Sequence, residues 1–428
     1  MSHRHARFLI ISLGLSLMAH ASAQTTVTFW NTNTSPIDIK GYTKIVDSFN
    51  RANPGIKVKL VQVVGSETDS AKLTSAVAGG TGPDVYLLDR FTVAERAASG
   101  VLTNLDSYVK AVPNLAAQYL PFAWKETQFK NSTYALPFDT DVRMLYYRKD
   151  VLKAAGVDLA QFDPKNGPIN SKRLMEIVSK VNKTDSTGAY TQVGFIPWYG
   201  QGWHYTWGYA YGGKFADAKG CQVTPTDAGV TAGYQFLADA AKALDPKKAQ
   251  TFLSTYAAPT NPPAQDPFVT GKMALEITGD WMAASLQEYA PKAQWGMTYV
   301  PTPDGKKVSW SGGWSAVIPK GAKNEAAAFK FMQYMTGAPG QRIYVKDTKH
   351  FPTYKSLLSE NNLYGPEQQF ERTLLTSSLS RPNLPVGALY WDELTRAQNA
   401  VVLGTGSVES SLAAVKSRVQ PRLNRFCR

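Results

Sequence analysis

The sequence predicts an α/β fold in which a parallel sheet is flanked by helices. Residues 26–30 and 56–60 have the pattern of strands, and the apolar residues between 42 and 49 recur with the period of a helix. The order strand, helix, strand is typical of a parallel sheet, because the helix returns the chain to the end where the next strand begins. The chain has 428 residues, more than one hydrophobic core usually serves, so two domains are expected.

The elements of this first unit have clear local signals. Tyr42, Ile45, Val46 and Phe49 fall on one face of a helix, which the Asn-Pro-Gly sequence at 53–55 ends. The strand that follows alternates apolar residues with lysines, as a half-buried strand does.

The same alternation continues to the C-terminus. Strands are expected over 84–88, 143–147, 272–278, 294–300 and 315–319, and helices over 71–78, 149–155 and 325–335. A last helix places Val408, Leu412, Val415 and Val419 on one stripe, and Pro421 is expected to end it. No long flexible linker interrupts the chain, so short crossovers should join the two domains.

The first residues have the pattern of an export signal. A basic start is followed by an apolar run over 8–18 and by the small residues Ala21, Ser22 and Ala23, which suit a cleavage site. Residues 1–23 are therefore predicted to be a signal peptide, which leaves a soluble periplasmic protein that begins near Gln24. No cysteine lies at the cleavage site, so lipid anchoring is not expected there. A retained N-terminal anchor is the alternative.

The net charge of +13 falls to +11 when Arg4 and Arg7 leave with the signal, because 44 Lys and Arg then face 33 acids. A basic balance can indicate a nucleic acid, an acidic membrane or an anionic ligand. Here the basic residues are scattered, with only short pairs such as Lys247 and Lys248. We interpret them as a solvated surface and expect a monomer that does not bind nucleic acid.

Cys221 and Cys427 are the two cysteines. Export would bring them into an oxidising compartment, where they could form a disulfide. Two free buried thiols are the alternative.

Few residues of the chain suit cofactor or metal chemistry. Only two histidines, His204 and His350, remain after cleavage. Two histidines are few for a zinc site, and neither lies in a motif typical of a serine triad. The glycine-rich residues 208–214 resemble part of a P-loop, but Phe215 stands where a magnesium-binding hydroxyl is needed. We therefore expect no cofactor, no metal and no catalytic residue.

Asp139 and Asp141 form the one arrangement with catalytic potential. On a strand their side chains would share a face at roughly 7 Å. Glycosidases use carboxylate pairs at roughly 5 to 9.5 Å. A secreted glycosidase is thus one alternative for the function, although adjacent acids more often bind hydroxyl groups.

Aromatic residues make up 11% of the chain and cluster strongly between 198 and 211. Trp198 and Trp203 are the candidate ligand-binding residues of this cluster. The apolar faces of sugar rings pack on Trp and Tyr, while sugar hydroxyl groups pair with carboxylates, amides and guanidinium groups. The alternative is that about half of these aromatic residues fill the core.

Polar and aromatic pairs also stand at the expected ends of strands, where ligands bind in open parallel sheets. These pairs are Trp30 with Asn31, Asp89 with Arg90, Asp280 with Trp281, and Gly313 with Trp314. We expect them to lie at one rim of the sheets.

Several segments resemble one family in sequence and in order. They are FNRANPGIKV at 49–58, GPDVYLLDRF at 82–91, ASGVL at 98–102, LPFDTD at 136–141, FVTGKMALEITGDW at 268–281, and RPNLP at 381–385 leading to Trp391. Together they resemble the family 1 extracellular solute-binding proteins of ABC importers, in the maltose and maltodextrin (sugar)-binding branch. The resemblance covers nearly all of the mature chain.

This resemblance implies the two-lobed periplasmic binding protein fold of type II, with a ligand cleft between the lobes. Lobe 1 is expected over 24–139 and 315–349, and lobe 2 over 140–314 and 350–428. The implied function is to capture a sugar, from mono- to oligosaccharide, and to deliver it to the membrane permease subunits of an ABC importer without chemical change. A receptor for a non-sugar solute is the second alternative.

The resemblance also assigns roles to individual residues. Asp89, Arg90 and Asp141 would bind sugar hydroxyl groups, and Trp281 and Trp391 would stack on sugar rings. At Thr34 and Ser35 the sequence departs from the family, which has charged sugar contacts there. This departure puts maltose itself in doubt as the ligand.

Overall fold

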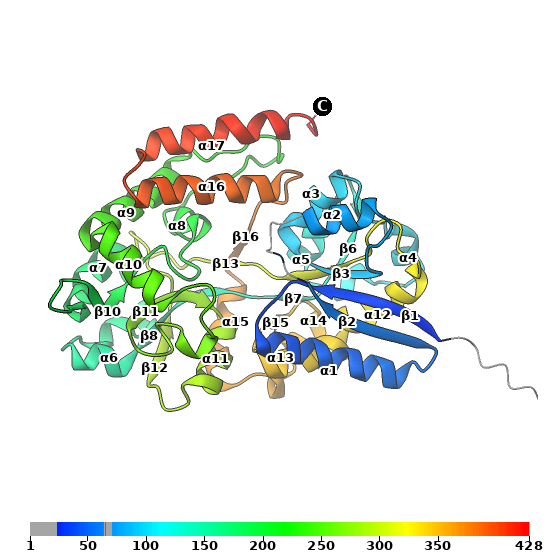
Figure 1. Cartoon of the computed structure of the whole chain (residues 1–428), viewed down its shortest axis with the longest axis horizontal. Helices are drawn as coiled ribbons and strands as arrows, with labels where there is room; N and C mark the ends of the chain where they lie inside the picture. The colour runs from blue at the N-terminus through cyan, green and yellow to red at the C-terminus, as the bar shows by residue number, and fades with distance from the viewer. Residues whose placement is uncertain (1–23, 64, 66–70, 428) are drawn as a thin grey trace, which may run out of the picture.

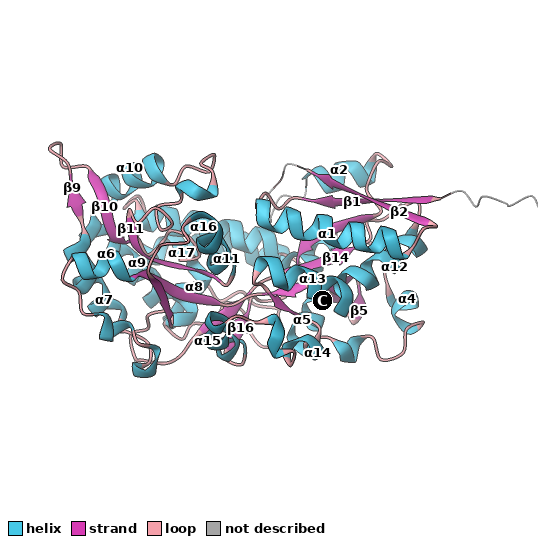
Figure 2. Cartoon of the chain, turned by 90° about the horizontal axis from the view of Figure 1, so that it is seen from below, coloured by secondary structure: helices cyan, strands magenta, loops and turns pink. Residues whose placement is uncertain are grey.

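The computed structural model describes residues 24–63, 65 and 71–427. The predicted export signal, residues 1–23, lies outside this described part. Two separate five-stranded sheets form the centres of two lobes, which lie side by side in Figures 1 and 2.

The first sheet has the strand order β2-β1-β3-β14-β6. Its strands are β1 (Thr25–Asn31), β2 (Ile56–Gln62), β3 (Val85–Asp89), β6 (Ala135–Pro137) and β14 (Trp314–Val317). β1 pairs with β2 and β3 in parallel, as the strand, helix, strand pattern predicts, whereas β14 is antiparallel to β3 and β6. The chain thus leaves this sheet after β6, which ends at Pro137, and returns between β3 and β6 only at Trp314.

Helices cover the first sheet because their apolar stripes face it. They are α1 (Pro36–Ala52), α2 (Ala71–Ala78), α3 (Val93–Ala98), α4 (Asp106–Lys110), α5 (Pro121–Glu126), α12 (Glu325–Thr336) and α13 (Ala338–Thr348). The core on one side joins Phe29 of β1 to Tyr42 of α1 and Phe331 of α12, all fully buried. The helical stripe read from residues 42 to 49 is this buried face.

The second sheet has the order β12-β8-β11-β10-β9 and is mixed rather than parallel. Its strands are β8 (Arg143–Arg148), β9 (Lys183–Thr184), β10 (Tyr190–Phe195), β11 (Met273–Gly279) and β12 (Trp295–Thr298). β10 and β11 are parallel, but β8 runs antiparallel to both β11 and β12.

The second lobe carries most of the remaining helices. They are α6 (Lys149–Ala154), α7 (Ser171–Val178), α8 (His204–Ala210), α9 (Ala228–Leu244), α10 (Pro246–Tyr256), α11 (Trp281–Tyr289), α16 (Gly387–Val402) and α17 (Val408–Leu423). In Figure 1 α16 and α17 lie above α8 and α9, and all four share one buried apolar cluster.

Short strands and two helices lie in the region between the lobes and at the edges of the lobes. They are β4 (Gln128–Phe129), β5 (Ser132–Thr133), β7 (Asp139–Thr140), β13 (Ser309–Ser311), β15 (Phe351–Pro352), β16 (Ser378–Ser380), α14 (Lys355–Leu358) and α15 (Pro366–Leu375). β7 pairs with β15, and β13 with β16, so short paired segments join the lobes instead of a tether.

The prediction that Pro421 ends the last helix is wrong. α17 continues to Leu423, because a proline in the last turn costs only the hydrogen bond to the carbonyl four residues earlier. Val419 and Leu423 on either side of Pro421 are fully buried, and their burial holds the turn together.

Cys221 and Cys427 form a disulfide. It joins the end of the chain, just after α17, to the loop between α8 and α9. Within the described ranges, no helix has both the length and the apolar character needed to cross a membrane.

Candidate functional site

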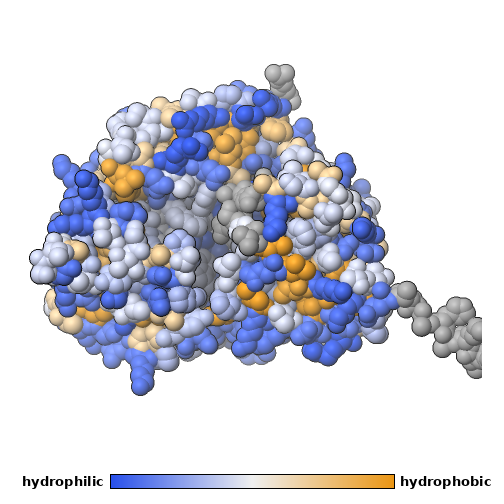
Figure 3. Space-filling view, in the orientation of Figure 1, coloured by the Kyte–Doolittle hydropathy of each residue, from blue (hydrophilic) through white to orange (hydrophobic). Residues whose placement is uncertain are grey.

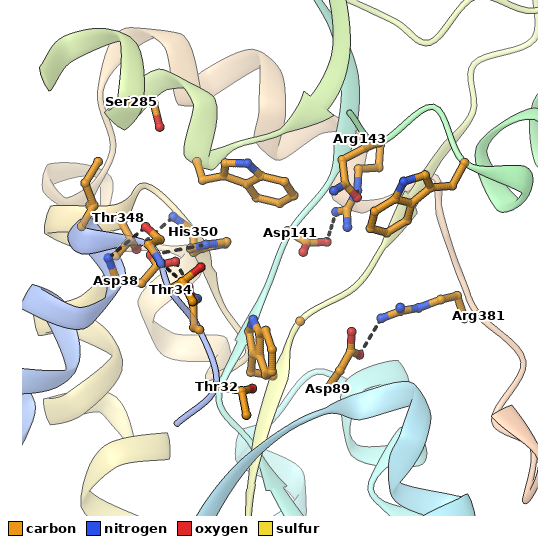
Figure 4. A pocket seen from close by; sticks show the side chains of 18 of the residues that line it. Thr32, Thr34, Asp38, Asp89, Asp141, Arg143, Ser285, Thr348, His350 and Arg381 are labelled. Carbon is orange, nitrogen blue, oxygen red and sulfur yellow. Dashed lines mark hydrogen bonds and ion pairs between the residues drawn. The ribbon is translucent and has the colours of Figure 1, made fainter. Parts of the chain in front are cut away.

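A cavity of about 600 Å³ opens between the two lobes. The surface is visibly hollowed there in Figure 3, and Figure 4 shows the side chains that line it. Its walls come from loops that follow β1 and β3, from the crossovers, and from α11, α8 and α16. A volume of this size falls in the range of small-molecule sites.

Hydroxyl-bearing side chains form the wall of the first lobe. Thr32, Thr34 and Ser35 line the cavity where the chain leaves β1 and enters α1. Asn31, a predicted site residue, does not line the cavity but is buried beneath this loop. Its amide oxygen accepts a hydrogen bond from the backbone N–H of Asn33 at 2.9 Å, and this bond fixes the path of the loop.

Four tryptophans from four different elements line the cavity. Trp314 opens β14, Trp281 opens α11, Trp203 precedes α8 and Trp391 lies in α16. All four were predicted from the sequence. Trp203, Trp281 and Trp314 keep part of their surface exposed, so their rings are available to a ligand.

Trp391 differs from the other three because aromatic rings surround it. Its ring meets that of Trp203 edge to face with centroids 4.5 Å apart, and that of His204 at 4.7 Å. Tyr205 stacks on it at 5.8 Å and Phe91 lies 5.5 Å away. Only 9% of Trp391 is exposed. Trp391 therefore packs against Trp203 and has little exposed ring surface on which a ligand could stack.

Asp89 faces the cavity together with Arg381, which the sequence analysis did not select. A guanidinium nitrogen of Arg381 donates to the Asp89 carboxylate at 2.6 Å, across 292 residues of sequence. Burial raises the pKa of Asp89, while Arg381 acts to lower it. The Arg381 guanidinium also lies 3.9 Å from the ring centroid of Phe91. Its place in the RPNLP motif was the only sequence signal for this residue.

Asp141 lines the cavity beside Arg143, a second residue that the analysis did not select. The Asp141 carboxylate accepts from the backbone N–H of Gly312 and pairs with Arg143. Burial opposes ionisation, but Arg143 lowers the pKa of Asp141 below its ordinary value. Arg143 in turn lies 4.9 Å from the Trp281 ring and 4.0 Å from the Trp310 ring.

Asp139 does not line the cavity but is buried behind it. Its carboxylate accepts from the backbone N–H of Trp314 at 2.6 Å. Burial raises its pKa to about 7. Gly313, which lines the cavity, has φ +130° and leaves no room for a Cβ beside Arg90 and the Asp139 carbonyl. A glycine is therefore required where this crossover passes the hinge strand.

Arg90 was predicted to bind sugar hydroxyl groups, yet the structure buries it completely, away from the cavity. It pairs with Glu126 at 2.8 Å and donates to the backbone carbonyls of Asp139 and Gly312. Arg90 thus fixes the two crossovers to each other.

Three further predicted residues also lie outside the cavity lining. Trp30 packs against the apolar cluster behind the first sheet, and Trp198 against apolar clusters of the second lobe. Asp280 is fully buried and accepts from the backbone N–H of Trp281, so it begins helix α11. This bond fixes where the Trp281 side chain leaves the helix.

His350 lines the cavity and was not predicted. Its ring stacks on Tyr344 at 5.6 Å and lies 5.5 Å from Trp281. Nδ1 lies 3.4 Å from Asp280 and 3.9 Å from Asp139. Burial alone would lower the pKa of His350, but these carboxylates raise it to about 10, so the ring is cationic at neutral pH.

His204, the other histidine that lines the cavity, is in the opposite protonation state. Burial lowers its pKa to about 3, so it is neutral. Within the part of the chain that the structure describes, no group of His, Cys, Asp and Glu side chains could hold a metal ion.

The family model for bacterial extracellular solute-binding proteins matches residues 33–342. The chain belongs to this family. A binding protein of Brucella abortus (strain 2308) is 22% identical over 424 residues, which span 94% of this chain and 96% of that one. The maltotriose-binding protein of Pyrococcus abyssi is 22% identical over 322 residues, 73% of this chain and 63% of that protein.

Solved structures of solute-binding proteins share the fold. The structure of CpMnBP1 with mannobiose bound superposes with a TM-score of 0.80 at 24% identity, covering 92% of this chain and all of that one. The predicted two-lobed fold of type II with a cleft between the lobes is thereby confirmed. The members of this family are binding proteins, which agrees with the architecture of two lobes around one cavity.

Proposed function

We propose that this solute-binding protein captures a sugar between its lobes in the periplasm and delivers it to the permease subunits of an ABC importer. The observation that carries the proposal is that Trp314 of the first sheet and three tryptophans of the second lobe surround one cavity that also holds Asp89, Asp141 and arginine side chains. Flat apolar ring faces and charged hydrogen-bonding groups are together what a saccharide needs. The sugars named for the similar proteins, mannobiose and maltotriose, support the same class of ligand.

The mechanism follows from the position of the cavity. A sugar that contacts both walls binds the closed arrangement of the lobes better than an open one, so binding favours closure. The lobe boundaries that we propose are those predicted from the sequence. Support for them comes from the two sheets, although β14 begins at Trp314, one residue before the proposed boundary.

We further propose that the protein binds without catalysis, acts as a monomer and does not bind nucleic acid. Asp139 and Asp141 are unsuited to acid and base chemistry on a ligand, because each carboxylate accepts a backbone hydrogen bond from the crossover at 312–314. Asp139 is 1% exposed. The proposed start of the mature chain at Gln24 can be checked by mass spectrometry of protein exported from cells.

A thermal-shift screen against mono-, di- and oligosaccharides tests the sugar proposal, since a ligand that binds the folded state raises the melting temperature. We expect at least one saccharide to bind, with confirmation by calorimetry and recovery of the intact sugar. The proposal fails if no saccharide stabilises the protein. Cleavage of the bound sugar would instead support a glycosidase.

A further inference from the structure

The two arginines of the cavity are each held by a carboxylate. Arg381 pairs with Asp89 at 2.6 Å, and Arg143 pairs with Asp141. All four side chains are at least nine-tenths buried. The two pairs lie close together beside Gly312, where a Cβ would meet Arg381, Asp141 and Arg143 at 3.2–3.3 Å, and Figure 4 shows both pairs at the cavity. The positive charge of each guanidinium group is thus already balanced by a carboxylate.

The third cation of the lining is surrounded by acids. His350 has Asp280 and Asp139 within 3.9 Å of Nδ1, and Asp38 at 3.9 Å from Nε2. Asp141 also acts on it through its charge. The positive charge of this ring is thus already balanced by carboxylates on three different elements.

Carboxylates outnumber cations around the cavity. Asp38, Asp89 and Asp141 line it, with Asp139 and Asp280 directly behind, and the lining residues that the structure describes include no lysine. The protein carries a net positive charge, but each cation that lines the cavity is already paired with a carboxylate.

We infer that the cavity selects saccharides without acidic groups and rejects uronates and sugar phosphates. This inference rests on the proposed function and adds the class of sugar. Carboxylate oxygens accept hydrogen bonds from sugar hydroxyl groups, which an ionised ligand oxygen cannot donate. An acidic ligand would lie beside carboxylates and meet only cations that are already paired, and such like-charge contacts are how binding sites reject wrong partners.

Matched sugars test the inference on the wild-type protein. Calorimetry should compare neutral mono-, di- and trisaccharides of glucose, mannose and galactose with their uronate and 6-phosphate counterparts. We expect every acidic counterpart of a binding sugar to be weaker by at least about 100-fold. An acidic counterpart that binds as tightly as its neutral partner overturns the inference but leaves the sugar function standing. If no neutral or acidic sugar binds, the proposed function fails as well.

Two variants test the cause. Asp89→Asn keeps an oxygen for the backbone N–H of Phe91 but removes the charge that holds Arg381. It should reduce the preference for the neutral sugar by about tenfold or more. Asp141→Asn should do the same through Arg143, and circular dichroism and melting curves verify that each variant is folded.

Asp347→Asn is the matched control, because Asp347 pairs with Lys44 on the surface and does not line the cavity. Its preference should equal that of the wild type. An unchanged preference in folded Asp89→Asn and Asp141→Asn protein would contradict the inference, since pairing would then not be what excludes acids.

Discussion

Nδ1 of His350 lies 3.4 Å from a carboxylate oxygen of Asp280, and this contact joins the segment after α13 to the start of α11. α13 packs against α1 and α12 of the first lobe, whereas α11 follows β11 of the second sheet. The imidazole ring stacks on Tyr344 and lies tilted at 5.5 Å from the Trp281 ring. One side chain thus links the hinge region to a tryptophan of the cavity.

The stability of the folded protein should fall as the pH rises from about 7 to 10. The pKa of His350 is raised from 6.5 to about 10, so its stabilisation is complete below 6.5 and is lost as the pH approaches 10. Below pH 7 the pKa of Asp139, raised to about 7 by burial, and the pKa of His204, lowered to about 3 by burial, change stability in opposite directions. Melting temperatures measured from pH 7 to 10 check the sign. A rise toward pH 10 would contradict the assignment for His350.

His350→Gln should destabilise the protein by about 3–5 kcal/mol at pH 8, because it leaves several buried carboxylates without their cation. The loss should be larger at pH 5 than at pH 8, because the stabilisation by His350 is complete below its unfolded pKa of 6.5 and is partly lost at pH 8. Denaturant unfolding at both values measures the difference. His204→Gln is the control with the opposite sign. Burial lowers the pKa of His204 to about 3, so at pH 5 the unfolded chain takes up a proton there and the folded chain does not, and the loss should be smaller at pH 5 than at pH 8.

The variants Trp314→Ala and Trp391→Ala should distinguish a tryptophan that binds sugar from one that stabilises the fold. The partly exposed Trp314 should lose about 2 kcal/mol of sugar affinity, roughly 30-fold in Kd, with little change in melting temperature. Trp391→Ala should cost about 3–5 kcal/mol of stability, because it leaves a gap among Trp203, Tyr205 and Phe91. Calorimetry and chemical unfolding of both variants check this. The reverse pattern would show that Trp391 offers the main stacking face.

Cys427→Ser should lower the free energy of unfolding by about 2–4 kcal/mol, because the disulfide to Cys221 closes a loop of 206 residues in the unfolded chain. The affinity for sugar should stay the same, since neither cysteine lines the cavity. Wild-type protein treated with reductant is the control and should melt with the variant. Equal stability with and without reductant would contradict the prediction.

Much of the site could be predicted from short motifs. Asp89, Trp281 and Trp314 were expected at the ends of strands and Asp141 on the hinge strand, and the structure brings them into one cavity. The reason is that strand ends in this fold share a rim, so the position of a residue along its strand largely fixes its place.

The orientation of neighbouring side chains could not be predicted. Asp89 and Arg90 are adjacent in sequence, but one lines the cavity and the other is buried against Glu126. Arg90 begins the turn after β3, and its guanidinium group donates to the carbonyls of Asp139 and Gly312 from distant parts of the chain. His350 carried no motif and was missed for the same reason.

Periodicity in the sequence predicted the alternation of strands and helices, and the chain length predicted two domains. The two-lobed architecture with a cleft, and the roles of Trp281 and Trp391, came from the resemblance to a known family. Only the tertiary structure decided which charges meet, as Asp89 and Arg381 do across 292 residues. The physical reason is that ion pairing and burial depend on distances in space, which local sequence does not specify.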